Sequence, residues 1–153
     1  MKGFYNRILV ADMTTETIEI RPLEDAVLER FLGGKGIGSY LLSTLNPPGV
    51  DPLDPDNVLI FATGPVTGSA VWGGCRYGVY TKSPQTGFYS ESYSGGRVPE
   101  AIDATGFDAV VIKGRREKPA VMAIGPQGAV FHDAGDIWGM DSYRTEDAVH
   151  ARF

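Results

Sequence analysis

The chain has 153 residues, with 14 Lys and Arg against 19 Asp and Glu and a formal net charge of −5. A chain of this length buries roughly two-thirds of its unfolded surface, so residues 1–153 are expected to form one domain with a hydrophobic core. The acidic balance and the lack of any Lys/Arg run exclude a broad nucleic-acid-binding surface. No apolar run reaches the about 20 residues of a membrane span or the roughly 7–15 of a secretion signal, so we expect a cytoplasmic protein without membrane contact.

The first half of the chain is expected to form a hairpin, two short helices and a buried strand. The hairpin strands are β-type runs on either side of a polar turn, and the helices show apolar residues at helical spacing between glycine or proline breaks. The strand is expected to be buried on both faces because its run is continuously apolar. The expected elements are strands over 7–12 and 17–21, helices over 24–32 and 37–45, and a strand over 58–62.

The second half adds short strands and two helices. The expected elements are strands over 76–82 and 87–92, a helix over 99–105, a strand over 109–112, a hairpin over 118–124 and 129–132, and a helix over 141–153. This order predicts an α+β fold with mixed short-stranded sheets and a few short helices, not a doubly wound sheet. The last helix ends at Phe153 without a cap, which indicates that the domain is incomplete at its C-terminal end.

The first glycine-rich segment is Gly33-Gly34-Lys35-Gly36-Ile37-Gly38. It fails the phosphate-binding P-loop pattern, because a glycine and not Ser or Thr follows Lys35. It also fails the dinucleotide-binding pattern, since Ser39 stands at the third glycine position and a helix precedes the segment. We therefore favour a tight junction between two helices, and the alternative is that exposed amides also face an anion.

The second segment is Gly73-Gly74-Cys75-Arg76-Tyr77. Paired glycines let the main chain approach a large flat or anionic group, and Arg76 offers a planar fork of donors to a carboxylate, a phosphate or a heterocycle. The alternative is an arginine whose head group lies in solvent. Cys75 is expected to be a small buried residue and not a nucleophile, because no histidine neighbours it in the sequence.

The third segment is Ser92-Tyr93-Ser94-Gly95-Gly96-Arg97, which leads into an expected helix. Successive glycine amides at a helix start form an anion-binding nest, and Arg97 adds positive charge. The alternative is an ordinary helix N-cap by Ser94. Two Gly-Gly pairs, each with an arginine close behind, favour an anion or cofactor platform that lacks a reactive group of its own.

The remaining polar residues carry no catalytic pattern. A single cysteine excludes a disulfide framework and an iron–sulfur cluster held by four thiolates of this chain. No spacing of histidines and acids predicts a zinc site or a catalytic triad. The histidines are interpreted as solvated or packed, and the acids as turn and cap residues: His132 and His150, and Asp54, Asp56 and Asp103.

The order of these motifs resembles the N-terminal domain of the aldehyde:ferredoxin oxidoreductases, the tungsten–pterin enzymes. The motifs that carry the resemblance are Phe31 to Gly36, Pro52 to Asn57, Ala62 to Gly68, Gly74 to Tyr77, Thr81 to Phe88, Ser94 to Gly96 and Ala104 to Ala109. They extend over essentially the whole chain. The resemblance reaches only about the first quarter of a family member.

The resemblance implies a part of an enzyme that oxidises an aldehyde to a carboxylate and passes electrons through a [4Fe–4S] cluster to ferredoxin. Its tungstopterin consists of two pterins whose dithiolene sulfurs hold tungsten and whose phosphates are linked by magnesium. By resemblance, Arg76 contacts a pterin, the main-chain carbonyl of Tyr93 ligates magnesium, and Gly95, with Ser94 and Gly96, holds a pterin phosphate. A guanidinium, glycine amides and a carbonyl oxygen suit these ligands.

Two departures from the family pattern shape the expectations. Tyr93 stands where a smaller polar side chain is expected, which leaves the carbonyl in place but narrows the space near the phosphates. The cluster cysteines and the acid–base residues belong to parts of the family beyond this chain, so the isolated chain is expected to be inactive and without cofactor. Its partners are the remaining domains of the enzyme, ferredoxin and the aldehyde, and an exposed base is compatible with a homo-oligomer. The alternatives are a free-standing binding or assembly module and, as the weakest, an enzyme that uses Cys75.

Overall fold

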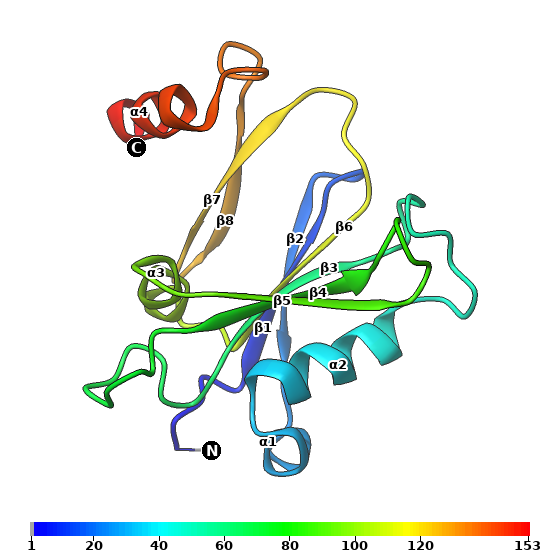
Figure 1. Cartoon of the computed structure of the whole chain (residues 1–153), viewed down its shortest axis with the longest axis vertical. Helices are drawn as coiled ribbons and strands as arrows, with labels where there is room; N and C mark the ends of the chain where they lie inside the picture. The colour runs from blue at the N-terminus through cyan, green and yellow to red at the C-terminus, as the bar shows by residue number, and fades with distance from the viewer. Residues whose placement is uncertain (1) are drawn as a thin grey trace.

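The computed structural model describes residues 2–153 and contains every element expected from the sequence (Figure 1). In chain order these are β1 (Arg7–Asp12), β2 (Thr17–Pro22), α1 (Asp25–Phe31), α2 (Gly34–Leu45), β3 (Leu59–Thr63), β4 (Tyr77–Lys82), β5 (Tyr89–Ser94), α3 (Val98–Ala104), β6 (Ala109–Lys113), β7 (Ala120–Gly125), β8 (Gly128–Asp133) and α4 (Ser142–Arg152). The largest shift is at α2, which begins three residues earlier than expected, and β5 begins two residues later than expected. The β4–β5 turn extends to Phe88, whose carbonyl accepts a 2.8 Å hydrogen bond from the Ser83 amide.

Six strands form one mixed sheet in the order β2-β1-β6-β3-β4-β5. Strands β1 and β6 are parallel, and all other neighbours are antiparallel. The two apolar runs expected to be buried strands, β3 and β6, are the central pair of this sheet. Hairpin β7–β8 forms a second, two-stranded sheet. The α+β class is confirmed, and the single parallel pair distinguishes this sheet from a doubly wound one.

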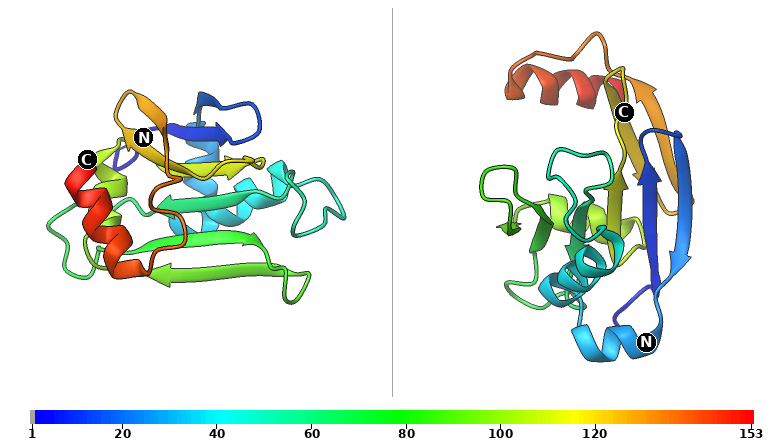
Figure 2. Two further views of the ribbon diagram at one scale, coloured as in Figure 1. Left: turned by 90° about the horizontal axis from the view of Figure 1, so that it is seen from above. Right: turned by 90° about the vertical axis from the view of Figure 1, so that its right-hand side faces the viewer.

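One face of the six-stranded sheet is covered by α1 and α2 (Figures 1 and 2). The buried side chains between these layers include Leu28, Ile37, Leu41, Ile60 and Tyr80. Their close packing is the main hydrophobic core, because burial of each large apolar side chain stabilises the fold by about 1.5–3 kcal/mol.

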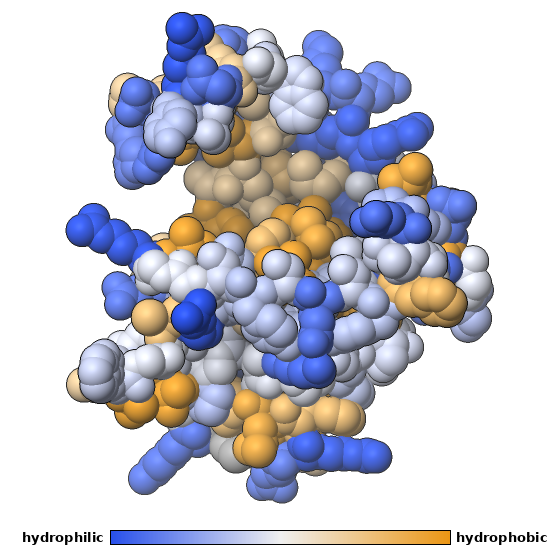
Figure 3. All heavy atoms as spheres, in the orientation of Figure 1, coloured by the Kyte–Doolittle hydropathy of each residue, from blue (hydrophilic) through white to orange (hydrophobic). Residues whose placement is uncertain are grey.

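The opposite face of the sheet is only partly covered. Hairpin β7–β8 packs over the β1 side, where Leu9 and Val110 are buried. Over β3 and β4 the face is more open, so Phe61 is half-buried while its neighbour Ile60 is fully buried. The expectation that this strand is buried on both faces is therefore wrong for one face. Figure 3 shows the resulting hollow, lined with apolar atoms, between α4 and the sheet.

Asp108 fastens the N-terminal segment to the end of β6. Its carboxylate accepts hydrogen bonds from the amides of Tyr5, at 3.0 Å, and Arg7, at 3.2 Å, and the residue is 5% exposed. Burial raises the pKa of Asp108 in spite of these hydrogen bonds.

None of the helices in residues 2–153 has the length and apolar character that a membrane span requires.

Candidate functional site

The three glycine-rich segments meet at one end of the sheet. There the start of α2, the loop 64–74 and strands β4 and β5 enclose a pocket of about 190 Å³. Its lining includes Gly34, Gly74, Arg76, Gly78 and Tyr93. The fold therefore brings together residues that are far apart in the sequence, and it leaves few side chains between the main chain and the pocket.

Gly33 and Gly34 form the tight helix junction that the sequence analysis favoured. Leu32 ends α1 in the left-handed region with φ 55°, and Gly33 and Gly34 follow with φ 76° and 51°. A Cβ at Gly36 would lie 1.8 Å from the Phe31 carbonyl oxygen, so the two helices can approach only because this position is glycine. This interpretation is confirmed, and an anion at these amides stays a prediction.

Thr67 fixes the loop that precedes Arg76. Its hydroxyl accepts a 3.1 Å hydrogen bond from the Gly64 amide and donates a 3.2 Å hydrogen bond to the Arg76 carbonyl. Gly74 lies so close to the loop that a Cβ there would be 2.7 Å from the Val66 carbonyl oxygen. The main chain on either side of Arg76 is thus held by the loop and by β4.

Arg76 extends beside Gly95 on the rim of the pocket. A Cβ on Gly95 would lie 3.3 Å from Nη1 of Arg76 and 3.1 Å from the Cys75 carbonyl oxygen, so a larger residue would press on the guanidinium. The side chain is exposed, and its guanidinium makes no hydrogen bond or ion pair within residues 2–153. The structure thus places a cation with its donors free among glycines.

Tyr93, Ser94 and Gly96 occupy the end of β5 and the turn that follows. Tyr93 is 50% exposed and lines the pocket, and its hydroxyl donates a 3.1 Å hydrogen bond to Glu91. Ser94 pairs with Tyr77 in the sheet and does not cap α3, whose N-cap residue is Arg97. The alternative of an N-cap by Ser94 is therefore wrong, since the turn separates it from the helix. Gly96 is exposed with φ 84°.

Tyr80 lies beneath this pocket and was not identified as a site residue from the sequence. The residue is fully buried, and its hydroxyl has no hydrogen-bond partner within the described residues. Glycines make room for it: a Cβ at Gly38 would lie 2.2 Å from its ring, and one at Gly78 would lie 2.0 Å from its hydroxyl. Burial raises the pKa of Tyr80, and nearby Tyr93 adds to the shift. The sequence feature that could have indicated Tyr80 is the pair of glycines that face its ring, Gly38 on α2 and Gly78 on β4.

Glu91 links the start of α2 to the edge strand β5. Its carboxylate accepts hydrogen bonds from Lys35 Nζ at 2.8 Å and from the Tyr89 hydroxyl at 2.8 Å, in addition to Tyr93. Tyr89 also shares a 2.9 Å hydrogen bond with Ser39 of α2. The hydrogen bond from Lys35 comes first among the causes that lower the pKa of Glu91.

Other residues considered in the sequence lie outside this pocket or act differently. Cys75 is exposed and free, so the expectation of a buried residue is wrong; it lies on a surface turn before β4. Asp54 accepts a hydrogen bond from the Asp56 amide, as expected of a turn. Asp103 is not a helix N-cap, because it lies inside α3, whose N-cap residue is Arg97. Its carboxylate accepts a 3.0 Å hydrogen bond from the Tyr5 hydroxyl, which brings the N-terminal segment against α3.

The histidines are packed or solvated, as interpreted. His132 contacts the ring of Phe153 at 4.6 Å between centroids, and His150 is exposed near Glu146 at 3.8 Å. Among residues 2–153, no three His, Cys, Asp or Glu side chains gather closely enough to hold a metal ion.

The architecture is shared with one part of a solved reductase complex. A solved structure of similar fold, the active site complex BamBC of benzoyl coenzyme A reductase in complex with 1,5-dienoyl-CoA, matches 99% of this chain with a TM-score of 0.94 and 28% sequence identity. The chain belongs to the aldehyde ferredoxin oxidoreductase family, because residues 8–153 match the family model of the N-terminal domain.

Two relatives show the range of the family. The tungsten-containing aldehyde ferredoxin oxidoreductase of Pyrococcus furiosus is 37% identical over 97% of this chain. The WOR-like subunit of an aliphatic sulfonate oxidoreductase from the same organism is 31% identical over 92% of the chain. This chain spans 25% and 23% of these relatives.

Proposed function

We propose that this chain is the tungstopterin base of a larger oxidoreductase, and that residues 1–153 form part of its N-terminal domain. The observation that carries the proposal is the Arg76 guanidinium, which has no hydrogen-bond or ion-pair partner within residues 2–153 and lies beside Gly95 at a glycine-rich pocket. In this role Arg76 holds a pterin, the Gly95 amide, with Ser94 and Gly96, holds a phosphate, and the Tyr93 carbonyl ligates magnesium.

The residues of the site fit such a cofactor. A large anion needs donors that are not used by the protein, and the exposed Arg76 guanidinium is such a group within residues 2–153. It also needs close approach of the main chain, which the absent Cβ atoms at Gly74 and Gly95 allow. The exposed Tyr93 side chain lies at the edge of the pocket, where its hydroxyl donates a hydrogen bond to Glu91.

The cofactor, when bound, accepts the two electrons released as an aldehyde and water become a carboxylate and three protons. In this proposal the rest of the enzyme would hold a [4Fe–4S] cluster that could pass these electrons to ferredoxin. The role of this chain is to bind and orient: Arg76 neutralises negative charge, and the ordered loop 64–74 keeps the guanidinium at the rim. Prearranged donors cost no reorganisation when charge moves in the reaction.

The proposed substrate class follows from the relatives described above and not from the residues of this pocket. The relatives include an aldehyde oxidoreductase and a sulfonate oxidoreductase, and the structural match is a benzoyl coenzyme A reductase complex, yet each aligns with more than nine-tenths of this chain. A shared base combined with different substrates indicates that specificity lies in other domains. Aldehyde oxidation is favoured because the aldehyde oxidoreductases share the higher identity.

Metal analysis and activity of the complete enzyme test the proposal. We expect Arg76→Ala to reduce tungsten per enzyme and aldehyde-dependent dye reduction, because the cofactor loses its cation. Arg30→Ala removes the same charge from the exposed end of α1 and serves as the matched control. Full tungsten content and activity in Arg76→Ala would remove Arg76 from the site. The isolated chain is expected to bind neither tungsten nor iron.

The second candidate function is a free-standing binding or assembly module. This alternative stays open because the chain spans only 25% of the length of the relative from Pyrococcus furiosus. The reading frame downstream distinguishes the two. A continuing frame with cysteines at cluster spacing supports the enzyme part, and a stop codon supports the module.

A further inference from the structure

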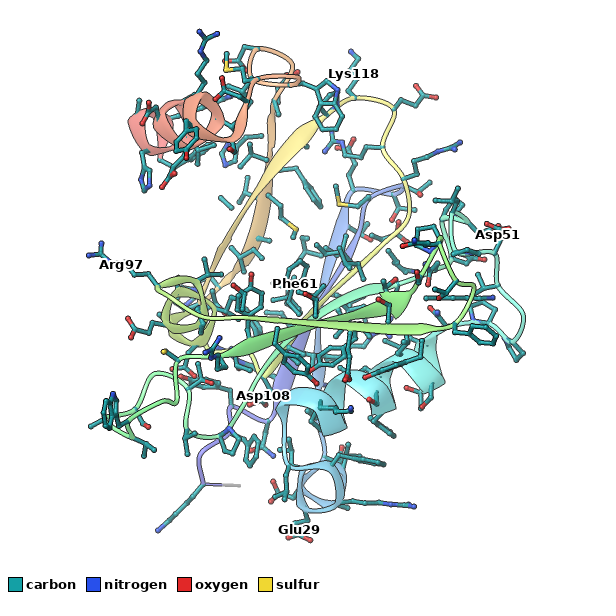
Figure 4. The ribbon with its side chains drawn as sticks, viewed as in Figure 1. Glu29, Asp51, Phe61, Arg97, Asp108 and Lys118 are labelled. Atoms are coloured by element: carbon teal, nitrogen blue, oxygen red, sulfur yellow. The ribbon has the colours of Figure 1, made fainter. Side chains whose placement is uncertain are left out.

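A second pocket lies at the opposite end of the six-stranded sheet from Arg76. It has a volume of about 460 Å³ and lies between the β1–β2 turn, Pro55 and the segment that joins β6 to β7. The side chains that matter here are those of Thr14, Glu16, Arg115, Arg116 and Lys118. Figure 4 shows Lys118 at the far end of the molecule from Glu29 and Asp108.

The walls of this pocket are fixed by hydrogen bonds of the main chain. The Met13 amide donates to the Lys113 carbonyl at 2.8 Å, and the Gly114 amide donates to the Pro55 carbonyl at 2.7 Å. The Arg115 amide donates to the Thr14 hydroxyl at 2.9 Å. Gly114 has φ 82°, and a Cβ there would lie 2.6 Å from the Thr14 hydroxyl, so the turn requires glycine. The basic segment is therefore held in place and does not depend on a ligand for its shape.

Arg116 is the residue that makes the pocket a candidate site. Its Nη2 pairs with Glu16 at 2.9 Å, and its guanidinium lies 5.4 Å from the centroid of the Phe131 ring. Its Nη1 is buried and has no hydrogen-bond partner within the described residues. A buried charged donor without an acceptor costs free energy, and such groups in native proteins normally meet a partner or a ligand.

The charges around Arg116 favour an anion as that ligand. Arg115 and Lys118 are exposed and make no ion pair within residues 2–153, while nearby Lys113 is already paired with Asp12 at 3.1 Å. Two acids face the same pocket, of which Glu16 is taken by Arg116 and Glu117 is exposed. The pocket thus offers three cations against two carboxylates, with two of the cations free.

We propose that this pocket binds a small oxyanion with more than one charge, bearing phosphate or carboxylate groups. Arg116 contributes its positive charge at the pocket wall, and Arg115 and Lys118 supply donors on the exposed side. Guanidinium and ammonium donors form their strongest hydrogen bonds with such oxygens. The volume exceeds that of a single phosphate and lies within the usual range for small-molecule sites, roughly 300–1,000 Å³. The proposal does not depend on the tungstopterin base, because the two pockets share no residue.

Titration of the ¹⁵N-labelled chain with potassium pyrophosphate and, separately, with potassium citrate tests the site by NMR. Ionic strength is kept constant with potassium chloride, and the chain carries Arg76→Gln so that the other pocket contributes no binding. We expect saturable one-to-one shifts of the amides 13–16 and 114–118 and of the Arg116 side chain. Tighter binding of pyrophosphate identifies the phosphate class, and tighter binding of citrate identifies the carboxylate class.

Variants decide whether the pocket itself is responsible. Arg116→Gln and the exposed double variant Arg115→Gln/Lys118→Gln are each expected to weaken binding about tenfold or more, because charge-assisted hydrogen bonds are lost. The double variant keeps the test valid if Arg116→Gln fails to fold. Arg30→Gln carries a comparable charge change far from the pocket and should bind as before. Shifts that spread over the surface, follow ionic strength only, or survive both pocket variants would overturn the proposal.

Discussion

The two ends of the six-stranded sheet each carry an arginine with donors that have no partner within residues 2–153, but the surroundings of the two arginines differ. Arg76 is exposed and surrounded by glycines, so the main chain itself forms the surface around it. Arg116 is four-fifths buried, paired with Glu16 and packed near an aromatic ring. The first arrangement leaves the guanidinium exposed beside a pocket of about 190 Å³ and contributes little to the fold. The second contributes to the fold and borders the larger of the two pockets, of about 460 Å³.

The largest effect is expected from filling the space beneath the Arg76 end. Gly38→Val places a branched side chain against the Tyr80 ring, from which even a Cβ would be only 2.2 Å away. Overpacking of a core costs typically 1–3 kcal/mol and more where the backbone must move, so we expect a loss at or above that range. Chemical denaturation measures it. Gly125→Ala, a position with no atom within 4 Å of the added Cβ, is the control.

A double variant sharpens this prediction. If the clash with Tyr80 is the cause, Gly38→Ala combined with Tyr80→Leu should recover much of the stability that Gly38→Ala loses alone, because the smaller side chain frees the space. If the loss of stability in the double variant equals the sum of the losses in the two single variants, the glycine acts through α2 and not through the ring.

Asp108→Asn is expected to give the next largest loss. The amide group of Asn cannot accept both main-chain hydrogen bonds, from Tyr5 and Arg7, so one buried donor loses its partner at a cost of about 1–3 kcal/mol. Denaturation at pH 7 measures this loss, and the exposed Asp147→Asn is the control. Equal stability of the two variants would mean that the N-terminal segment does not depend on Asp108.

The pH dependence of the same variant has a defined sign. The folded-state pKa of Asp108 is raised, so the folded state binds the proton more tightly than the unfolded state, and this group's contribution to stability falls as pH rises through the folded pKa. Asp108→Asn should therefore remove the decrease in the free energy of unfolding that occurs just above the pH range in which an ordinary Asp titrates. An unchanged curve shape would contradict the raised pKa.

Glu91→Gln is expected to have a smaller effect with the opposite pH sign. The pKa of Glu91 is lowered, first by the hydrogen bond from Lys35, so its stabilising contribution is present above about pH 4.5 and is lost as pH falls through the folded pKa. The variant should be less stable at neutral pH and should lose less on acidification. Acid titrations of unfolding, with exposed Glu100→Gln as the control, measure the difference.

Much of the fold could be predicted because its signals are local. Alternating or continuous apolar runs gave the strands, and glycine and proline breaks gave the helix limits, as at Leu32 and Gly33. The half-buried face of β3 was missed, because a continuous apolar run does not reveal which face lacks a covering layer.

The site was predictable only in its main-chain features. Paired glycines indicated close approach, and the structure does bring Gly95 against Arg76. The buried Tyr80 and the Lys35–Glu91 link depend on contacts between α2 and β4 or β5, with 56 positions separating Lys35 from Glu91. The exposure of Cys75 likewise depends on how the loop 64–74 folds back, which no spacing in the sequence encodes.

The smallest effect is expected from Arg76→Gln, and it tests the comparison of the two ends directly. Since the guanidinium has no partner within residues 2–153, its loss should change the free energy of unfolding by no more than about 0.5 kcal/mol. Arg116→Gln removes the Glu16 ion pair and the packing near Phe131, so it should cost more, about 1 kcal/mol. Parallel urea denaturation of both variants measures the difference. If Arg76→Gln proves the more destabilising, its guanidinium supports the fold and is not held free for a ligand.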